Sequence, residues 1–466
     1  MSSNWCALLK YDVIIIGAGL SGLAAGIRLA HFGKKTLIME RHYRVGGLNS
    51  FYRAGGYDLD VGLHAVTNFN SKGLKSAPLS RLMRRLRIKE DDLELCPQKE
   101  SRITFPNVSL NFNNDIRFLT QQIEESFPDQ RDGFIRLIDN IIRMSKDGFL
   151  QKADSGRKFL KRFITDPYLL EMIICPLMFY GNAREHDMDH DFVALMFFSL
   201  FIEGLSRPQK GIRAILDLLL KRYEDSGGEL QTQSEVVKIK LKDGSVSGVI
   251  TGSDELIECD AVLSSAGIDE TYNICREVGN NKLITPGVMS FAESIYILDK
   301  KPLELSIDHS IIFYNRSTTF KYQKPLEPIN VDSGVICMPG NFTYNEPQTK
   351  EEIRVTHIAN PNYWIDADQG EYTNSKMLWH DRSLDAVSEI MPSFRENIVY
   401  RDMFTPKTIK RFTGHTSGVV YGAPDKIRDG MTSVNNLYII GTDQGFVGIV
   451  GAMIGGVEVV NRQLLV

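Results

Sequence analysis

The stretch YDVIIIGAGLSGLAAGIRLAHFGKKTLIMERHYRVGGLNSF, residues 11–51, decides the fold. DVIII is a β-branched run typical of a buried parallel strand, and it leads directly into the motif Gly17-x-Gly19-x-x-Gly22. LSGLAAGIRLAHFG then predicts a helix, and KKTLIME predicts a second strand that ends at Glu40. The stretch therefore predicts a β-α-β unit of the Rossmann type, which places the chain in the α/β class.

The three glycines of this motif suit a phosphate-binding turn. The first permits a tight turn, the second lets the backbone approach a pyrophosphate, and the third lets the helix pack closely on the strand. The helix N-terminus then faces the phosphates, and the carboxylate of Glu40 is placed to accept hydrogen bonds from a ribose diol. The pattern predicts a dinucleotide site formed by Gly17, Gly19, Leu20, Ser21, Gly22, Glu40 and Arg41.

A second glycine pair, Gly46-Gly47, follows the ribose acid and discriminates between dinucleotides. A nicotinamide domain has no need for such a pair, whereas a flavin domain uses one to pass the chain beside the pyrophosphate. The residues therefore favour FAD, with Gly46, Gly47 and Leu48 at the phosphates.

Length and composition narrow the class of protein. A chain of 466 residues is expected to form two or three domains, and a net charge of -4 provides no field for nucleic acid. The six cysteines never form C-x-x-C, which argues for reduced thiols and against a dithiol centre or a metal cluster. No apolar run reaches the ~20 residues that a membrane-spanning helix needs. We expect a cytoplasmic protein without a metal site or a nucleic-acid partner.

The chain resembles the FAD-dependent flavoproteins related to phytoene desaturase, carotenoid isomerase and retinol saturase, and more distantly the flavin amine oxidases. GGYDLDVGLHAVTNF, residues 55–69, matches the segment that follows the glycine pair in that family. In those relatives the segment runs beneath the isoalloxazine ring. The resemblance therefore implies that Gly62, Leu63 and His64 lie near the flavin.

The middle of the chain carries a weaker match. RPQKGIRAILDLLLKRYEDSGGELQTQSEVVKIK, residues 207–240, is similar to a family segment that begins Pro-x-Gly-Gly, although Pro208-Gln209-Lys210-Gly211 has one glycine fewer. The resemblance implies that backbone groups of Val236 and Val237 hold the adenine end of FAD.

The C-terminal stretch NNLYIIGTDQGFVGIVGAMIGGVEVVNRQLL provides the most specific match. It predicts a strand, a Gly441-Thr442-Asp443 turn and a helix rich in small residues. The resemblance implies that Gly441 and Asp443 meet the ribityl-pyrophosphate region. It also implies that the ring's pyrimidine edge approaches the helix N-terminus, whose dipole stabilises negative charge, at Gly448, Ile449 and Val450. No cysteine lies in this segment, so we expect FAD to be bound non-covalently.

These segments predict a discontinuous FAD-binding domain of residues 1–75, 215–275 and 405–466. Residues 76–214, with helical periodicity, and 276–404, with mixed strands and helices, are expected to form an α+β substrate or membrane-associating domain.

Two apolar segments of the first insertion each allow two interpretations. Phe192–Ile202 is rich in Phe and Met, which suits a tunnel for a long hydrocarbon or a buried core helix. GRKFLKRFITDP, residues 156–167, combines an apolar stripe with basic flanks. It suits peripheral contact with an anionic membrane, or a surface helix docked on the protein's own core.

The resemblance implies hydride transfer between a carbon of a lipophilic, carotenoid-like isoprenoid and flavin N5, with a proton leaving or arriving at the neighbouring carbon. The candidate catalytic residues are His64, His415, Tyr421 and Arg411, although a histidine near a glycine turn is more often structural. The electron acceptor is a quinone, oxygen or none.

Several functions share this architecture. Desaturation or isomerisation of an isoprenoid is the preferred interpretation, followed by saturation of a retinoid or polyene and by amine oxidation. A prenyl-lipid-binding chaperone of the GDP-dissociation-inhibitor type has the same fold without flavin. Glu40 and the Gly46-Gly47 pair have no purpose in such a chaperone.

Overall fold

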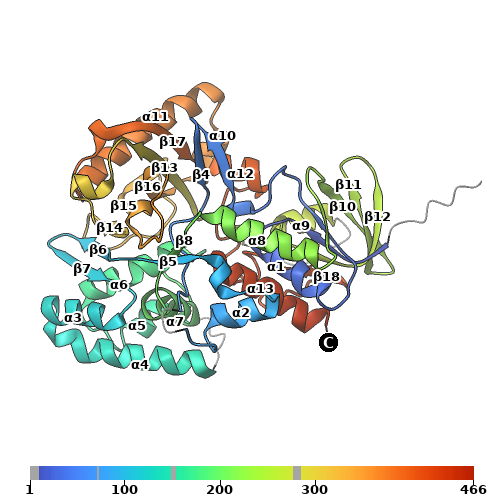
Figure 1. Cartoon of the computed structure of the whole chain (residues 1–466), viewed down its shortest axis with the longest axis horizontal. Coiled ribbons are helices and arrows are strands. Elements are labelled where there is room, and N and C mark those ends of the chain that lie inside the picture. Colours follow the sequence, from blue (N-terminus) through green and yellow to red (C-terminus); the bar gives the residue numbers. More distant parts are fainter. Residues whose placement is uncertain (1–9, 71–72, 148–153, 276–284, 466) are drawn as a thin grey trace, which may run out of the picture.

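The computed structural model describes residues 10–70, 73–147, 154–275 and 285–465. Two seven-stranded sheets dominate it, and Figure 1 shows them in opposite halves of the molecule. Two short antiparallel pairs complete the described strands: the hairpin of β3 and β4, and β5 with the distant β8. Their bounds are Phe51–Ala54, Tyr57–Asp60, Leu95–Pro97 and Ser206–Pro208.

The first sheet has a parallel core in the order β9-β2-β1-β12-β18. In that order the strands are Glu229–Gln231, Thr36–Met39, Lys10–Ile16, Leu256–Ser264 and Leu437–Ile439. An antiparallel hairpin, β10 (Val236–Lys242) and β11 (Ser245–Thr251), extends the sheet from the first half of β12. Strands from three distant parts of the chain thus form one sheet.

Successive side chains of β1 point to opposite faces of this sheet, and both faces are covered by other elements. Val13 and Ile15 pack against helices α1 (Leu20–Ala30), α8 (Ile212–Asp225) and α13 (Gly448–Gln463). Ile14 and Ile16 pack on the opposite face, against side chains of the β10–β11 hairpin. The β-α-β unit predicted from the sequence is therefore present, with both faces of its first strand buried.

The first helix, α1, and the last helix, α13, pack against each other. Close approach requires glycine: a Cβ on Gly456 of α13 would lie 2.3 Å from the carbonyl oxygen of Ser21. Within the motif, a Cβ on Gly22 would lie 2.1 Å from the carbonyl oxygen of Gly17. The third glycine thus has the packing role expected for it.

The second sheet is mostly antiparallel, in the order β17-β13-β16-β15-β14-β6-β7. In that order the strands are Ile398–Phe404, Ser290–Leu298, Glu351–Ala359, Ile329–Cys337, Ile311–Asn315, Ser101–Phe105 and Val108–Phe112. One face packs on helices of the first insertion, and the other packs on a long helix, α11. The covering helices are α3 (Ile116–Ser126), α4 (Arg131–Asp147), α5 (Gly156–Leu160), α6 (Pro167–Phe179), α7 (His190–Phe197) and α11 (Gln369–Ser388), with α10 (Pro361–Asp366) beside α11. This mixed α+β arrangement and the parallel sheet confirm the expected fold class.

Two elements pack on a different sheet from the one expected for the segment of sequence that contains them. Helix α2 (Pro78–Leu86), in the predicted substrate insertion, packs its apolar face on the helices of the first sheet. The β3–β4 hairpin, in the predicted FAD segment, packs on β13 of the second sheet. The exact domain boundaries stay a prediction. Among the described residues, no helix is long and apolar enough to cross a membrane.

Candidate functional site

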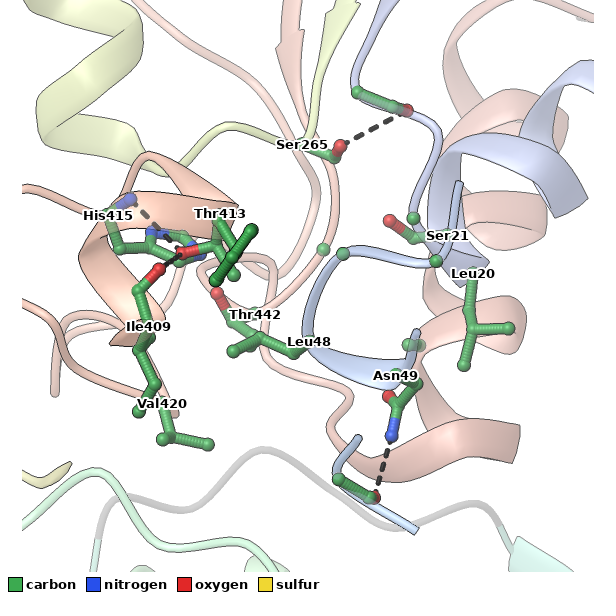
Figure 2. A pocket seen from close by; sticks show the side chains of 18 of the residues that line it. Leu20, Ser21, Leu48, Asn49, Ser265, Ile409, Thr413, His415, Val420 and Thr442 are labelled. Carbon is green, nitrogen blue, oxygen red and sulfur yellow. Dashed lines mark hydrogen bonds between the residues drawn. The ribbon is translucent and has the colours of Figure 1, made fainter. Parts of the chain in front are cut away.

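A cavity of about 540 Å³ lies where the parallel strands of the first sheet end. Its wall contains residues that lie one or two positions after the ends of β1, β2, β12 and β18, namely Gly17, Glu40, Ser265 and Gly441. Ligands of open α/β sheets bind at this edge, and the volume is in the usual range for ligand sites. Figure 2 shows Leu20 and Ser21 on one side of the cavity, with Thr413 and His415 of the C-terminal segment on the other.

Two helices direct their N-termini into the cavity. Gly19 and Ser21 at the start of α1 line it, as do Gly448 and Ile449 at the start of α13. The first turn of a helix has backbone N–H groups without intrahelical partners and a positive dipole end, which together attract negative charge. One cavity therefore offers two separate anion-stabilising ends.

A side chain on a glycine of the cavity's turns would either clash with the protein or project into the cavity. Gly17 has a φ of +97°, and a Cβ there would lie 2.3 Å from Ser265 Oγ. Ser265 Oγ in turn donates to the carbonyl of Ile16 at 2.8 Å, which fixes it beneath the turn. A Cβ on Gly19 would meet no protein atom within 4 Å, so a side chain there would enter the cavity. The backbone is thus bare where a pyrophosphate must approach.

Glu40 lines the cavity beside this turn. Its Oε2 accepts a hydrogen bond from the N–H of Ala18 at 2.8 Å, and its Oε1 accepts one from the N–H of His42 at 2.9 Å. A carboxylate has about four acceptor sites, so capacity remains for ligand hydroxyl groups. The position and chemistry of Glu40 fit a ribose diol.

The same end of the cavity contains Arg41 and His415. The guanidinium of Arg41 donates to the carbonyl of Arg411 at 2.8 Å, and it lies against Gly414. His415 Nδ1 is 3.9 Å from Glu270 Oε2. Burial alone would raise the pKa of Glu270, but the interaction with His415 and the hydrogen bond from the N–H of Thr416, at 2.8 Å, hold it below its usual value. His415 therefore lines the same cavity as Glu40 and Arg41, beside Glu270, and a catalytic role for it stays a prediction.

The other end of the cavity is apolar and aromatic. It is lined by side chains from α6, β13, β15 and the loop before β18, namely Phe179, Tyr180, Phe291, Val335, Val420 and Tyr421. Tyr421 Oη donates to the carbonyl of Phe179 at 2.5 Å, and burial raises the pKa of Tyr421 well above its usual value. The Tyr421 ring therefore forms part of the wall while its proton is committed to the backbone.

A polar cluster adjoins this apolar compartment. His64 Nε2 lies 2.8 Å from Glu293 Oε2 and 2.8 Å from Thr356 Oγ1, and all three residues line the cavity. The fully buried Arg354 binds Glu293 and also donates to the carbonyl of Asp60 at 2.7 Å. Burial alone would raise the pKa of Glu293, but Arg354 and His64 hold it well below its usual range. Glu293 is therefore an ionised carboxylate inside the protein.

A second buried arginine fixes the segment that carries His64. Arg207 donates to the carbonyl of His64 at 2.8 Å, and it pairs with the carboxylate of Asp60 at 2.9 Å. Gly62 has a φ of +63°, and a Cβ there would lie 2.3 Å from the carbonyl oxygen of Leu48. These contacts fix the backbone of residues 60–64 beside the cavity.

Most of the predicted site residues line this single cavity. They are Gly17, Gly19, Leu20, Ser21, Glu40, Arg41, Gly46, Gly47, Leu48, Gly62, His64, Val236, Gly441, Gly448, Ile449, His415 and Tyr421. Their contact with a cofactor or a substrate stays a prediction, but the structure brings them together from three parts of the chain.

Six predicted residues lie outside the wall, each for a physical reason. Gly22, Leu63 and Val450 are buried in packing against neighbouring elements. Val237 is 43% exposed, because alternate side chains of β10 point to opposite faces. Asp443 and Arg411 have other partners.

Asp443 is a structural residue of the loops around the cavity. Its carboxylate accepts hydrogen bonds at 2.7 Å from the N–H groups of Ile268 and Ala423. Arg411 is exposed, and its guanidinium lies over the ring of Phe412, 5.3 Å from the centroid. Arg411 thus lies outside the cavity wall, and a catalytic role for it stays a prediction.

Sequence reasoning missed the residues that other elements bring to the cavity. Ser265 and Ala266 directly follow β12 in CDAVLSSAG, where small residues after an apolar run are a signal that could have identified them. Glu293 and Thr356 come from separate strands of an insertion with no motif of its own. They pair across β13 and β16, a contact that no local pattern reveals.

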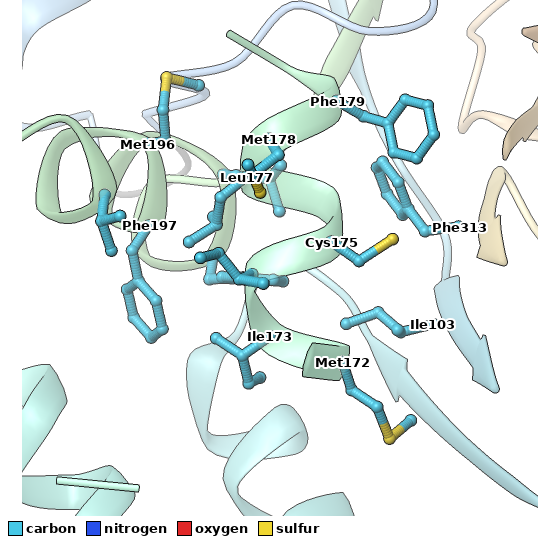
Figure 3. Close-up of a cluster of buried hydrophobic side chains, with 14 of the residues drawn as sticks. Ile103, Met172, Ile173, Cys175, Leu177, Met178, Phe179, Met196, Phe197 and Phe313 are labelled. Atoms are coloured by element: carbon cyan, nitrogen blue, oxygen red, sulfur yellow. The ribbon is translucent and has the colours of Figure 1, made fainter. Parts of the chain in front are cut away.

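The two apolar segments of the first insertion belong to the protein's own core. Phe192–Ile202 forms the end of α7 and a following π-helical turn, and none of its residues lines the cavity wall described above. Figure 3 shows Met196 and Phe197 packed beside α6. This part of the chain is a core helix, and the tunnel interpretation is wrong for it.

Residues 156–167 pack their apolar side chains on the protein's own core. Helix α5 spans only Gly156–Leu160, and Phe159, Leu160 and Ile164 are buried in the core. Arg157 pairs with Glu171 at 2.5 Å instead of facing outward. The apolar stripe is thus unavailable to a membrane, and the second of the two interpretations is the correct one.

The arrangement fits FAD. Bare glycine turns and the α1 N-terminus face the place for a pyrophosphate, and Glu40 faces the place for a ribose. The α13 N-terminus lies beside the aromatic compartment, where a flat ring system can be held. Side chains on these glycines would fill the cavity or strain its turns.

Comparison with known proteins agrees with this geometry. The family model of flavin containing amine oxidoreductases matches residues 20–296. Prolycopene isomerase 2 of an Oncidium hybrid cultivar is 22% identical over 97% of this chain and 84% of its own. All-trans-retinol 13,14-reductase of Danio rerio is 23% identical over 97% and 86%, and the lycopene-forming phytoene desaturase of Pseudescherichia vulneris is 24% identical over 84% and 85%.

Solved structures share the fold. An oxidoreductase from Methanosarcina mazei superposes with a TM-score of 0.68 at 17% identity, covering 97% of this chain and 100% of its own. Putrescine oxidase bound to putrescine gives a TM-score of 0.65 at 15% identity, covering 98% and 100%. The resemblance inferred from the sequence is confirmed. The chain belongs to the family of flavin containing amine oxidoreductases, and it is an FAD-dependent oxidoreductase.

Proposed function

We propose that this enzyme acts on a long isoprenoid polyene, by desaturation or isomerisation. The observation that carries the proposal is the apolar, aromatic compartment that adjoins the α13 N-terminus. The names of the relatives support it, since carotenoids and retinol are polyenes.

The residues of the dinucleotide end would hold FAD in a fixed orientation. The N–H groups at the start of α1 would meet the pyrophosphate, and Glu40 would accept the ribose hydroxyls. When bound, FAD supplies a hydride acceptor, or in its reduced form a hydride donor, at N5. The start of α13 stabilises negative charge that develops on the ring.

The residues of the aromatic end would bind and orient the polyene. Phe179, Phe291 and Tyr421 offer flat apolar surfaces, and burial of a hydrocarbon there removes it from water. The carboxylate on this side, Glu293, is already paired with Arg354. This arrangement suits an uncharged hydrocarbon better than an ammonium group, which needs a free carboxylate or an aromatic cage.

Substrate oxidation tests this function directly. The purified yellow protein is mixed anaerobically with liposomes that contain phytoene, prolycopene or all-trans-retinol, and the flavin absorbance and the extracted lipids are followed. We expect one of these polyenes to bleach the flavin or to change its double-bond pattern, and air or a quinone to restore the colour. A flavoprotein that ignores every polyene but releases hydrogen peroxide with putrescine would contradict the proposal.

A further inference from the structure

His64 is held by two side chains of the second sheet. Glu293 on β13 and Thr356 on β16 are directly paired across the two strands. Thr356 Oγ1 donates to Glu293 Oε2 at 2.9 Å, and both groups contact Nε2 of His64 at 2.8 Å. The ring of His64 is thus fixed through one nitrogen only.

The charge of Glu293 decides which ring nitrogen of His64 carries the hydrogen. Arg354 and the hydrogen bond from His64 keep the pKa of Glu293 below its usual range despite burial, so this carboxylate accepts hydrogen bonds and donates none. Nε2 must therefore be the nitrogen that bears hydrogen. In a neutral imidazole the other nitrogen, Nδ1, then carries the lone pair.

Nδ1 of His64 faces open space. This nitrogen has no hydrogen bond to a described residue, and it is not buried away from solvent. The space that His64 lines is the cavity, next to the aromatic compartment. An imidazole with one nitrogen bound to a carboxylate and the other free is the arrangement of an oriented general base.

We propose that His64 Nδ1 is the proton acceptor of the reaction and that Glu293 is the positioning residue that makes it so. This inference rests on the proposed function and gives it a direction, dehydrogenation. With FAD bound, one C–H bond of the substrate would lose its hydrogen with both electrons to the flavin, and the adjacent C–H bond would lose a proton to Nδ1. The electron pair left behind would form the new C=C bond, and a quinone or oxygen would take the two electrons from the flavin.

The tautomer can be observed without any substrate. Solid-state ¹⁵N NMR of the flavoprotein labelled at histidine, recorded at alkaline pH, separates protonated from unprotonated ring nitrogens. The spectrum of His64→Gln identifies the His64 signals by difference. We expect hydrogen on Nε2 and a bare Nδ1. Hydrogen on Nδ1 in the wild-type protein would overturn the proposal, whatever the substrate proves to be.

Two variants separate positioning from structure. In Glu293→Gln the amide oxygen must face Arg354, a pure donor, so the amide NH₂ faces Nε2 and drives hydrogen onto Nδ1. Glu352→Gln is the matched control, because Glu352 also pairs with Arg354, at 2.6 Å, and is also buried. We expect the tautomer to change in Glu293→Gln and to stay in Glu352→Gln.

The rate of flavin reduction by a reactive polyene gives the kinetic readout. We expect Glu293→Gln to slow it about 100-fold with little change in KM, the usual size of a lost general base. Glu293→Asp should recover part of that loss, and Glu352→Gln should stay within about threefold of wild type. Equal losses in Glu293→Gln and Glu352→Gln would show a structural role only. Absence of turnover in the wild type would contradict the proposed function but leave the tautomer result valid.

Discussion

The two ends of the cavity are built in different ways. The dinucleotide end consists of glycine turns and helix starts that follow strands of one parallel sheet, and much of each turn is contiguous in sequence. The substrate end is assembled from single side chains on α6, β13, β15 and β16, far apart along the chain. Backbone geometry forms the first end and side-chain identity forms the second. This difference predicts that mutations at the two ends have separable effects on flavin binding and on turnover.

The largest effect is expected at the third glycine of the motif. In Gly22→Val the side chain would overlap the carbonyl oxygen of Gly17. Its Cβ alone would lie 2.1 Å from that oxygen. We expect a loss of about 3 kcal/mol in unfolding free energy and no bound flavin, because backbone cannot move aside as a side chain can. Chemical denaturation and the visible spectrum measure both.

Gly19→Ala is the matched control for that variant. Its Cβ would contact no protein atom within 4 Å, but it would enter the cavity. We expect unfolding free energy within about 0.5 kcal/mol of wild type, measured on the flavin-free protein, and FAD affinity lowered at least tenfold. Unchanged affinity in Gly19→Ala would move the pyrophosphate away from this turn.

The next largest effect is expected on FAD affinity, at the glutamate that faces the place for a ribose. Glu40→Gln keeps the size of the side chain and removes its charge and one acceptor, on which the N–H groups of Ala18 and His42 depend. We expect FAD to bind about 10- to 100-fold more weakly, the cost of one or two charge-assisted hydrogen bonds. Isothermal titration with FAD measures this, and AMP should lose affinity by a similar factor. Equal FAD affinity in both proteins would exclude Glu40 from the ribose.

At the other end, Phe291→Ala should affect turnover and spare flavin binding. Phe291 is buried, lines the aromatic compartment and packs edge-on against Tyr421 at 5.7 Å. Its loss enlarges the compartment, so we expect kcat/KM for a polyene to fall about tenfold or more, since a buried aromatic contact contributes over 1 kcal/mol. A fall in FAD affinity with unchanged kcat/KM would contradict the division between the two ends.

The smallest effect is expected at Arg411. Its side chain is exposed and contacts Phe412, and only its carbonyl serves the site, by accepting from Arg41. Arg411→Ala should therefore leave FAD affinity and turnover within about twofold of wild type, as is usual for surface substitutions. A large loss in steady-state rate would restore the catalytic role that the sequence suggested.

The sequence was informative where function resides in local backbone. Gly17, Gly19 and Glu40 occur in one β-α-β unit, so their spacing alone predicts their common site. The C-terminal helix start at Gly448 was predicted from its small residues and the strand before it. Each of these signals is a turn with a fixed geometric requirement.

The sequence did not predict the site residues that come together through the pairing of distant strands. Glu293 and Thr356 meet because β13 and β16 are neighbours, and the register of two strands cannot be read from either strand. For the same reason the apolar stripe of residues 156–167 allowed two interpretations. Its periodicity shows that one face is buried, but not whether protein or lipid covers it.

A crystal structure of the yellow protein tests the central claim most directly, that both chain ends hold one FAD molecule. We predict pyrophosphate oxygens within hydrogen-bond distance of N–H groups at Gly19–Ser21, and the pyrimidine edge of the ring at the start of α13. The ring should also face the compartment that contains His64. A flavin bound by one chain end alone, or a ring remote from His64, would contradict the claim.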